Sequence, residues 1–212
     1  MLNLQKELVE KEQQYGGLIT NVPRVKVSIH DPRTPEQLKV GGMTGGDRMS
    51  KHGYAKKYSE YLKPFVDSDK SLVIVEIGIL TGIGLAIWCD IFTNCRIIGL
   101  DIDLGHFSSN TQNLSRLGAF KRNKPEVYEF DQFMDNTEYF RKKLNNKKID
   151  VMIDDGFHST ESILQTIKSV IPHLNNNFVY FIEDNDKVHN EIRCMYPDFK
   201  VVNDGELTII SN

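Results

Sequence analysis

Short apolar runs alternate with amphipathic segments from residue 71 to the end of the chain. The runs contain valine, isoleucine and leucine with almost no polar alternation, which is typical of strands buried on both faces of a parallel sheet. Strands are predicted at 72–77, 95–100, 127–130, 149–153, 178–182, 199–202 and 207–210. Helices are predicted at 82–92, 106–117, 134–144, 159–171 and 187–196. This alternation predicts an α/β fold with a doubly wound, mostly parallel sheet of seven strands and right-handed crossovers.

The end of the chain departs from this alternation. The last two predicted strands are separated by Asn203, Asp204, Gly205 and Glu206. Asp-Gly between two strands indicates a hairpin. We therefore expect the sheet to finish in an antiparallel hairpin.

The N-terminal part has a different character. Its apolar positions predict a short helix over 1–14, whereas 15–48 is rich in glycine and proline, which forbids long regular elements. A loop of that length is usually a lid, an interface arm or disordered. A further helix is expected over 50–64 and should stop at Pro64. We therefore divide the chain into a helix and arm, 1–48, and a main domain, 49–212, with the arm as a candidate lid or homo-oligomer contact.

Composition narrows the class of partner. The chain has 212 residues, enough for one sizeable domain, and a net charge of −3, which gives no reason to expect nucleic acid. No run approaches the ~20 apolar residues that span a bilayer, and the N-terminus has no apolar signal core. Cys89, Cys95 and Cys194 lack metal-type spacing and are typical of reduced thiols. We expect a cytoplasmic protein with a small-molecule partner.

Acidic residues follow two of the predicted strands. The stretch 154–158 reads Asp-Asp-Gly-Phe-His, and Glu183 and Asp184 follow the next strand. If these strands are neighbours, four carboxylates and the imidazole of His158 meet at one edge of the sheet. Like charges brought that close repel and lose hydration unless something offsets them. A divalent cation would offset them, and a metal beside a histidine suggests a catalytic site.

A glycine-rich loop follows the first strand of the predicted sheet. It contains Glu76, Gly78, Gly82 and Gly84, and glycines at such a turn let the backbone approach a ligand beside a helix N-terminus. The spacing differs from the G-x-G-x-x-G dinucleotide pattern, and no Gly-Lys-Ser/Thr follows, so it is not a phosphate loop either.

Polar residues also end the next two strands. An acid at Asp101 can accept hydrogen bonds from both hydroxyls of a ribose. Asp131 and Gln132 end the third strand, where they could meet an adenine ring. Ligands of open α/β sheets bind outside the carboxyl ends of the strands, so all these features fall on one edge.

The loop from Glu76 to Gly84, followed by Asp101 and a terminal hairpin, resembles the S-adenosylmethionine site of class I methyltransferases over roughly 70–212. The resemblance implies a Rossmann-like methyltransferase fold. It also implies a cofactor site at a defined set of residues, namely Glu76, Gly78, Gly82, Gly84, Asp101, Asp131, Gln132, Asp154 and Tyr54.

A narrower resemblance is to the metal-dependent sugar O-methyltransferases of macrolide biosynthesis, the mycinamicin and macrocin type. It rests on the 154–158 stretch with Glu183 and Asp184, and on an upstream segment from Gly46 to Tyr58. That segment usually reads Thr-Asp-Lys in the family, whereas Gly46 and Arg48 flank the aspartate in this chain. The resemblance implies a saccharide hydroxyl as methyl acceptor.

The same resemblance assigns roles at the acceptor end. Asp155, Glu183 and Asp184 would hold magnesium, and His158 would be the catalytic base, acting beside Asp155. Three oxygen donors suit magnesium, manganese or calcium better than zinc. Asp154 has a supporting interpretation as well, in which it caps the following helix or bonds the backbone.

Two other functions compete with methyl transfer. Asp-Asp-Gly-x-His also resembles proteins described as cephalosporin hydroxylases, although iron(II) oxygenases usually use two histidines and one carboxylate. The second alternative is a non-catalytic module that keeps a cofactor pocket, against which the intact acids and histidine argue.

Overall fold

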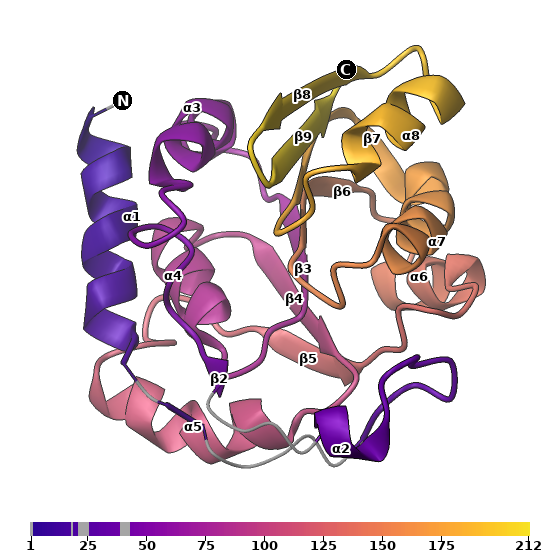
Figure 1. Ribbon diagram of the computed structural model, residues 1–212. Coiled ribbons are helices and arrows are strands. Elements are labelled where there is room, and N and C mark those ends of the chain that lie inside the picture. The colour runs from indigo at the N-terminus through magenta and orange to yellow at the C-terminus, as the bar shows by residue number, and fades with distance from the viewer. Residues whose placement is uncertain (1, 18, 21–25, 39–42) are drawn as a thin grey trace.

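A seven-stranded sheet forms the centre of the computed structural model, which describes residues 2–17, 19–20, 26–38 and 43–212. Its strands are β3 (Val73–Ile77), β4 (Arg96–Asp101), β5 (Glu126–Glu129), β6 (Ile149–Asp154), β7 (Leu174–Ile182), β8 (Lys200–Asp204) and β9 (Leu207–Ser211). Their spatial order is β5-β4-β3-β6-β7-β9-β8 (Figure 1). The pairs from β5 through β7 are parallel, and β9 is antiparallel to β7 and to β8. The predicted sheet with its terminal hairpin is confirmed.

Helices cover both faces of this sheet. They are α1 (Leu2–Tyr15), α2 (Pro35–Leu38), α3 (Ala55–Val66), α4 (Ile83–Ile91), α5 (Gly105–Arg116), α6 (Thr137–Leu144), α7 (Thr160–Val170) with the 3-10 turn η1 (Ile171–His173), and α8 (Val188–Met195). Two short strands, β1 (Ile19–Thr20) and β2 (Met43–Thr44), pair in the N-terminal segment. Among the described helices, none has the length and apolar character needed to cross a membrane.

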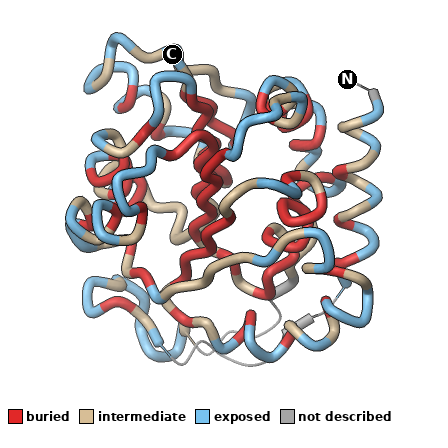
Figure 2. Tube along the Cα trace, turned by 180° about the vertical axis from the view of Figure 1, so that it is seen from behind, coloured by how far each residue is buried: buried red, intermediate tan, exposed pale blue. Residues whose placement is uncertain are grey.

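The core has two halves, one on each side of the sheet. Successive strand residues point to opposite faces, so Ile74 belongs to the half of the core that includes side chains of α1, α3, α4 and α5, and Val75 belongs to the half that includes side chains of α6, α7 and α8. Both side chains are at most 1 % exposed. Figure 2 shows the buried residues gathered in the central strands, which explains why these strands read as continuous apolar runs.

The largest differences from the predicted boundaries are in α3 and β7. Helix α3 begins at Ala55 instead of residue 50, and it continues through Pro64 to Val66. Proline lacks a backbone N–H, but in the last turn this removes only one helical hydrogen bond, so the helix does not have to stop there. Strand β7 begins at Leu174, before the apolar run. The apolar pattern missed this start because the next three residues, Asn175, Asn176 and Asn177, are polar and exposed.

The predicted N-terminal helix is confirmed as α1, and it packs against α3 and α4. Leu8 and Tyr15 are fully buried on its inner face. The Tyr15 hydroxyl donates a hydrogen bond to Asp90 at 2.5 Å, and the Lys11 ammonium lies 2.7 Å from the same carboxylate. The helix is thus part of the main core, while the lid or interface role of the segment that follows stays a prediction.

The sheet has a topological switch point between β3 and β6. From β3 the chain proceeds outward through β4 to β5, and from β6 it proceeds the other way through β7. The loops that follow β3 and β6 therefore diverge at the carboxyl edge. Ligands of open α/β sheets bind in the crevice at such a point.

Candidate functional site

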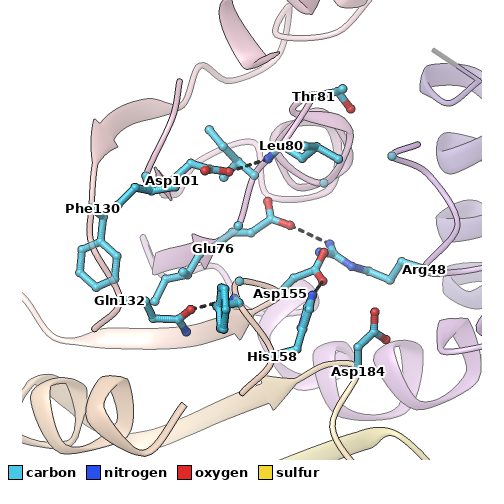
Figure 3. A pocket seen from close by; sticks show the side chains of 18 of the residues that line it. Arg48, Glu76, Leu80, Thr81, Asp101, Phe130, Gln132, Asp155, His158 and Asp184 are labelled. Atoms are coloured by element: carbon cyan, nitrogen blue, oxygen red, sulfur yellow. Dashed lines mark hydrogen bonds and ion pairs between the residues drawn. The ribbon is translucent and has the colours of Figure 1, made fainter. Parts of the chain in front are cut away.

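A cavity of about 380 Å³ lies at this switch point. The loops after β3 and β6 form its walls, together with the ends of β4 and β5 and the segments 28–33 and 45–48. Many of the residues predicted from sequence line it: Glu76, Gly78, Gly84, Asp101, Asp131, Gln132, Asp155, His158 and Asp184. Figure 3 shows the arrangement, with Asp101 and Leu80 at one end and His158 and Asp184 at the other.

The glycines of the β3 loop allow very close packing at the switch point. Gly78 has a φ of 81°, and a Cβ there would collide with the backbone carbonyl of Asp155. Gly84, in the first turn of α4, lies against the Glu76 carboxylate, which a Cβ would displace. Gly82 immediately precedes that helix. Gly78 therefore lets the loop after β3 contact the loop after β6, and Gly84 leaves room for the Glu76 carboxylate against α4.

Asp101 holds the far end of the glycine loop. Its Oδ2 accepts a hydrogen bond from the Leu80 amide at 2.9 Å, and Oδ1 accepts one from the Asp103 amide at 3.2 Å. Asp131 is tied in a similar way, by the Phe133 amide at 3.0 Å and the Ser28 hydroxyl at 2.8 Å. Both carboxylates line the cavity and shape its loops, and contact with a ribose or a base stays a prediction.

Asp154 and Gln132 form a support for the 155–158 loop. The Gln132 amide donates to Asp154 Oδ1 at 2.6 Å, and its oxygen accepts the Phe157 N–H at 2.9 Å. The Tyr180 hydroxyl donates to Asp154 Oδ2 at 3.1 Å. Burial raises the pKa of Asp154 to about 6. Asp154 lies behind the cavity wall, and helix α7 is capped by the Ser159 hydroxyl, so the predicted helix cap at Asp154 is wrong.

Arg48 occupies the centre of the acid cluster, a role for which the sequence analysis gave no prediction. Its Nη1 lies 2.7 Å from Glu76 Oε1, its Nη2 lies 2.8 Å from Asp155 Oδ2, and its Nε lies 2.8 and 2.9 Å from the two Glu183 oxygens. One guanidinium therefore joins the ends of β3, β6 and β7. In Figure 3 it points between Glu76 and Asp155.

The cluster brings three carboxyl groups to one guanidinium, which can balance only one of them when all are ionised. Burial raises the pKa of Glu76, Asp155 and Glu183, although Arg48 opposes the rise at each of them. Burial disfavours the charge of Arg48 too, but Glu183 and Glu76 keep the pKa of Arg48 well above its usual value. One Glu76 oxygen, Oε2, is buried with no hydrogen-bond partner among the described residues. The site is therefore suited to a further cationic group.

Asp155, His158 and Asp184 converge on the cavity. One ligand atom from each lies within 4.8 Å of the others. His158 Nδ1 lies 3.2 Å from the Glu183 carbonyl oxygen, and Nε2 lies 3.7 Å from Asp155 Oδ1. His158 and Asp184 have φ values of 64° and 55°, an uncommon backbone conformation for residues with side chains. Such conformations often occur at functional sites.

Glu183 and Tyr54 lie elsewhere than the resemblance implied. Both Glu183 oxygens contact Arg48, and Oε1 also accepts a hydrogen bond from Tyr58, so the predicted metal set of Asp155, Glu183 and Asp184 does not converge. Two groups converge among the described residues, and neither contains Glu183: Asp155, His158 and Asp184 at the cavity, and His52, Asp184 and Glu206 beside it. Tyr54 donates to Asp184 Oδ1 at 2.8 Å and lies apart from the glycine loop, outside the cavity lining.

Glu12 of α1 is a second residue for which no role was predicted. It is 1 % exposed, and its carboxylate accepts hydrogen bonds from the Met49 and Ser50 amides at 2.7 and 2.9 Å and from the Ser50 hydroxyl at 2.6 Å. It thereby fixes the turn that carries Arg48. Its position offers a signal, because it shares the buried face of the helix with Leu8 and Tyr15.

Comparisons with known proteins point to methyltransferases. No family model matches the chain. It is 30 % identical to an L-olivosyl-oleandolide 3-O-methyltransferase of Streptomyces antibioticus over 142 residues, which are 63 % of this chain and 32 % of that protein. The chain spans about a third of the length of the curated relatives it matches.

Solved structures show the same architecture. The MycE methyltransferase of the mycinamycin biosynthetic pathway, in complex with Mg and SAH, is similar with a TM-score of 0.60 at 15 % identity, covering 77 % of this chain and 50 % of that one. A TDP-rhamnose 3'-O-methyltransferase of calicheamicin biosynthesis has a TM-score of 0.56 at 13 % identity and covers 99 % and 93 %. The chain therefore has the class I methyltransferase fold.

Proposed function

We propose that this protein is an S-adenosylmethionine-dependent O-methyltransferase that acts on a hydroxyl of a sugar or glycosylated small molecule with the help of a divalent metal. The observation that carries the proposal is the cavity at the switch point. It has a glycine loop with Asp101 at one end and an acid cluster with a histidine at the other. Methyl transfer needs a cofactor pocket and a deprotonating acceptor site in line.

The cofactor would occupy the end near Glu76, Gly78 and Asp101. Its sulfonium and ammonium groups are cationic, and Glu76 at this end belongs to a cluster in which three carboxyl groups share the single guanidinium of Arg48. Asp131 would lie near the adenine. The names of the relatives support the choice, since one of the solved structures is a complex with SAH.

His158 would be the base that takes the proton of the acceptor hydroxyl. Because Nδ1 lies 3.2 Å from a carbonyl oxygen, the tautomer with a proton on Nδ1 is favoured, and Nε2 then has a free lone pair. After proton uptake the imidazolium would be stabilised by Asp155, which lies 3.7 Å from Nε2. A general base of this kind typically contributes ~10²–10⁴-fold in rate.

A divalent metal would be held by Asp155 and Asp184, with room for acceptor oxygens. Two carboxylates beside a cavity fit a hard cation such as magnesium. When bound, the ion would lower the pKa of a sugar hydroxyl and orient it. Glu183 contacts Arg48 with both oxygens, so we leave it out of this set. His158 and His52 belong to separate groups that share Asp184, and no group among the described residues combines two histidines with a carboxylate, which disfavours the hydroxylase alternative.

Product analysis tests the proposal. Purified protein would be incubated with S-adenosylmethionine, magnesium and a panel of nucleotide sugars and glycosides, and the mixtures analysed by mass spectrometry. We expect at least one acceptor to gain one methyl group while S-adenosylhomocysteine forms in equal amount. Cofactor turnover with methylation of nitrogen or carboxyl acceptors alone would contradict the sugar assignment.

A further inference from the structure

Arg48 contacts two of the carboxylates that the sequence assigned to a metal. We propose that Arg48 is a built-in counter-ion that competes with a divalent cation for the acid cluster and so keeps the metal affinity of this site low. This inference rests on the metal part of the proposed function. It concerns the binding of the ion and not the chemistry that follows.

The contacts define what a cation would have to displace. Both Glu183 oxygens lie within 2.9 Å of the Arg48 Nε, and Asp155 Oδ2 lies 2.8 Å from Nη2. Asp155 Oδ1 lies 3.7 Å from His158 Nε2 and is not the oxygen that contacts Arg48. A metal on Asp155 and Glu183 would replace the guanidinium, and a metal on Asp155 and Asp184 would stand beside it. The first arrangement gives up the contacts of a buried guanidinium, and the second places like charges close together in a buried site, so each costs free energy.

The fold fixes the position of the Arg48 side chain. The turn that carries it is held by Glu12, and the guanidinium carbon lies 5.7 Å from the ring centre of Trp88 and 6.0 Å from that of Tyr58. The arginine side chain is only 9 % exposed. An arginine held in this way remains at the carboxylates whenever no cation displaces it, so its removal should leave them available.

Titration of the cofactor-free protein with Mn²⁺, followed by electron paramagnetic resonance, tests the inference. We expect Arg48→Gln to bind Mn²⁺ about tenfold more tightly than wild type or better, because close charge pairs have large coupling energies. The matched control is Arg33→Gln, which removes a charge from the same cavity but from an ion pair with Asp31, 2.6 Å away. Its Mn²⁺ affinity should stay close to wild type.

Equal affinities in wild type and Arg48→Gln would overturn the inference. If Arg48→Gln folds only when Mn²⁺ is present, the metal has replaced the arginine and the inference is supported. If it folds in neither condition, Arg48→Lys decides, since a compact ammonium does not span the three carboxylates with the rigid fork geometry of a guanidinium. Tighter Mn²⁺ binding by Arg48→Lys supports the inference, and unchanged binding contradicts it. Failure of methyl transfer would not affect this titration, which uses no cofactor.

Discussion

At the scale of single residues, the site depends on His158, which has an uncommon backbone conformation, and on Arg48, whose contacts are distant in the sequence. His158 has a left-handed backbone and one ring nitrogen against the Glu183 carbonyl, which orients the other nitrogen toward Asp155. His158 and Asp155 were predicted together because they share the Asp-Asp-Gly-Phe-His stretch that carries the family resemblance. The sequence could not assign Arg48, because the partners of this residue lie 28, 107 and 135 positions away in the chain.

Replacement of the base gives the prediction at this scale. His158→Ala should fold and bind cofactor as the wild type does, and its kcat should fall by ~10²–10⁴-fold because no other group takes the proton. Steady-state methyl transfer and calorimetry of cofactor binding would measure the two quantities. The control is His173→Ala, whose ring contacts the Thr137 carbonyl instead of the cavity and which should keep its kcat. A wild-type kcat in His158→Ala would exclude the base assignment.

At the scale of elements, α1 contributes to the site through Glu12, which holds the turn that carries Arg48. The pattern of apolar residues was sufficient to predict this helix and nearly all strands, because those elements bury a periodic apolar face. For Glu12 the pattern indicates only a place on the buried face, since the partners of its carboxylate cannot be read from it. The buried Glu12 carboxylate satisfies two amides of the turn at Met49 and Ser50.

Removal of that carboxylate should therefore destabilise the protein. Glu12→Ala leaves two amides unsatisfied, and we expect a loss of about 1–3 kcal/mol in the free energy of unfolding, measured by urea denaturation. Glu10→Ala on the same helix is the control. Among the described residues Glu10 forms an ion pair with Lys6 at 3.4 Å, and both side chains are largely exposed, so the loss in Glu10→Ala should stay below about 0.5 kcal/mol. Similar losses in both variants would show that Glu12 does not hold the turn.

At the scale of the whole molecule, the strand order places all the polar signals of the sequence at one switch point. The order β5-β4-β3-β6-β7-β9-β8 brings the loops after β3 and β6 together, so the glycine loop and the 154–158 stretch share a cavity. Sequence reasoning anticipated this edge because parallel strands align their carboxyl ends. It could not anticipate that Arg48, carried by the N-terminal segment, would take up the Glu183 carboxylate expected to bind metal.

Calorimetric titration with S-adenosylhomocysteine, with and without magnesium, tests the central claim most directly. Because the claim places the cofactor at the switch-point cavity, we predict one binding site per chain in both conditions. Loss of binding on filling the loop, as in Gly84→Leu with a wild-type circular dichroism spectrum, would locate the site beside Glu76. Absence of binding to the wild-type protein in both conditions would contradict the claim that this cavity is the cofactor site of a methyltransferase.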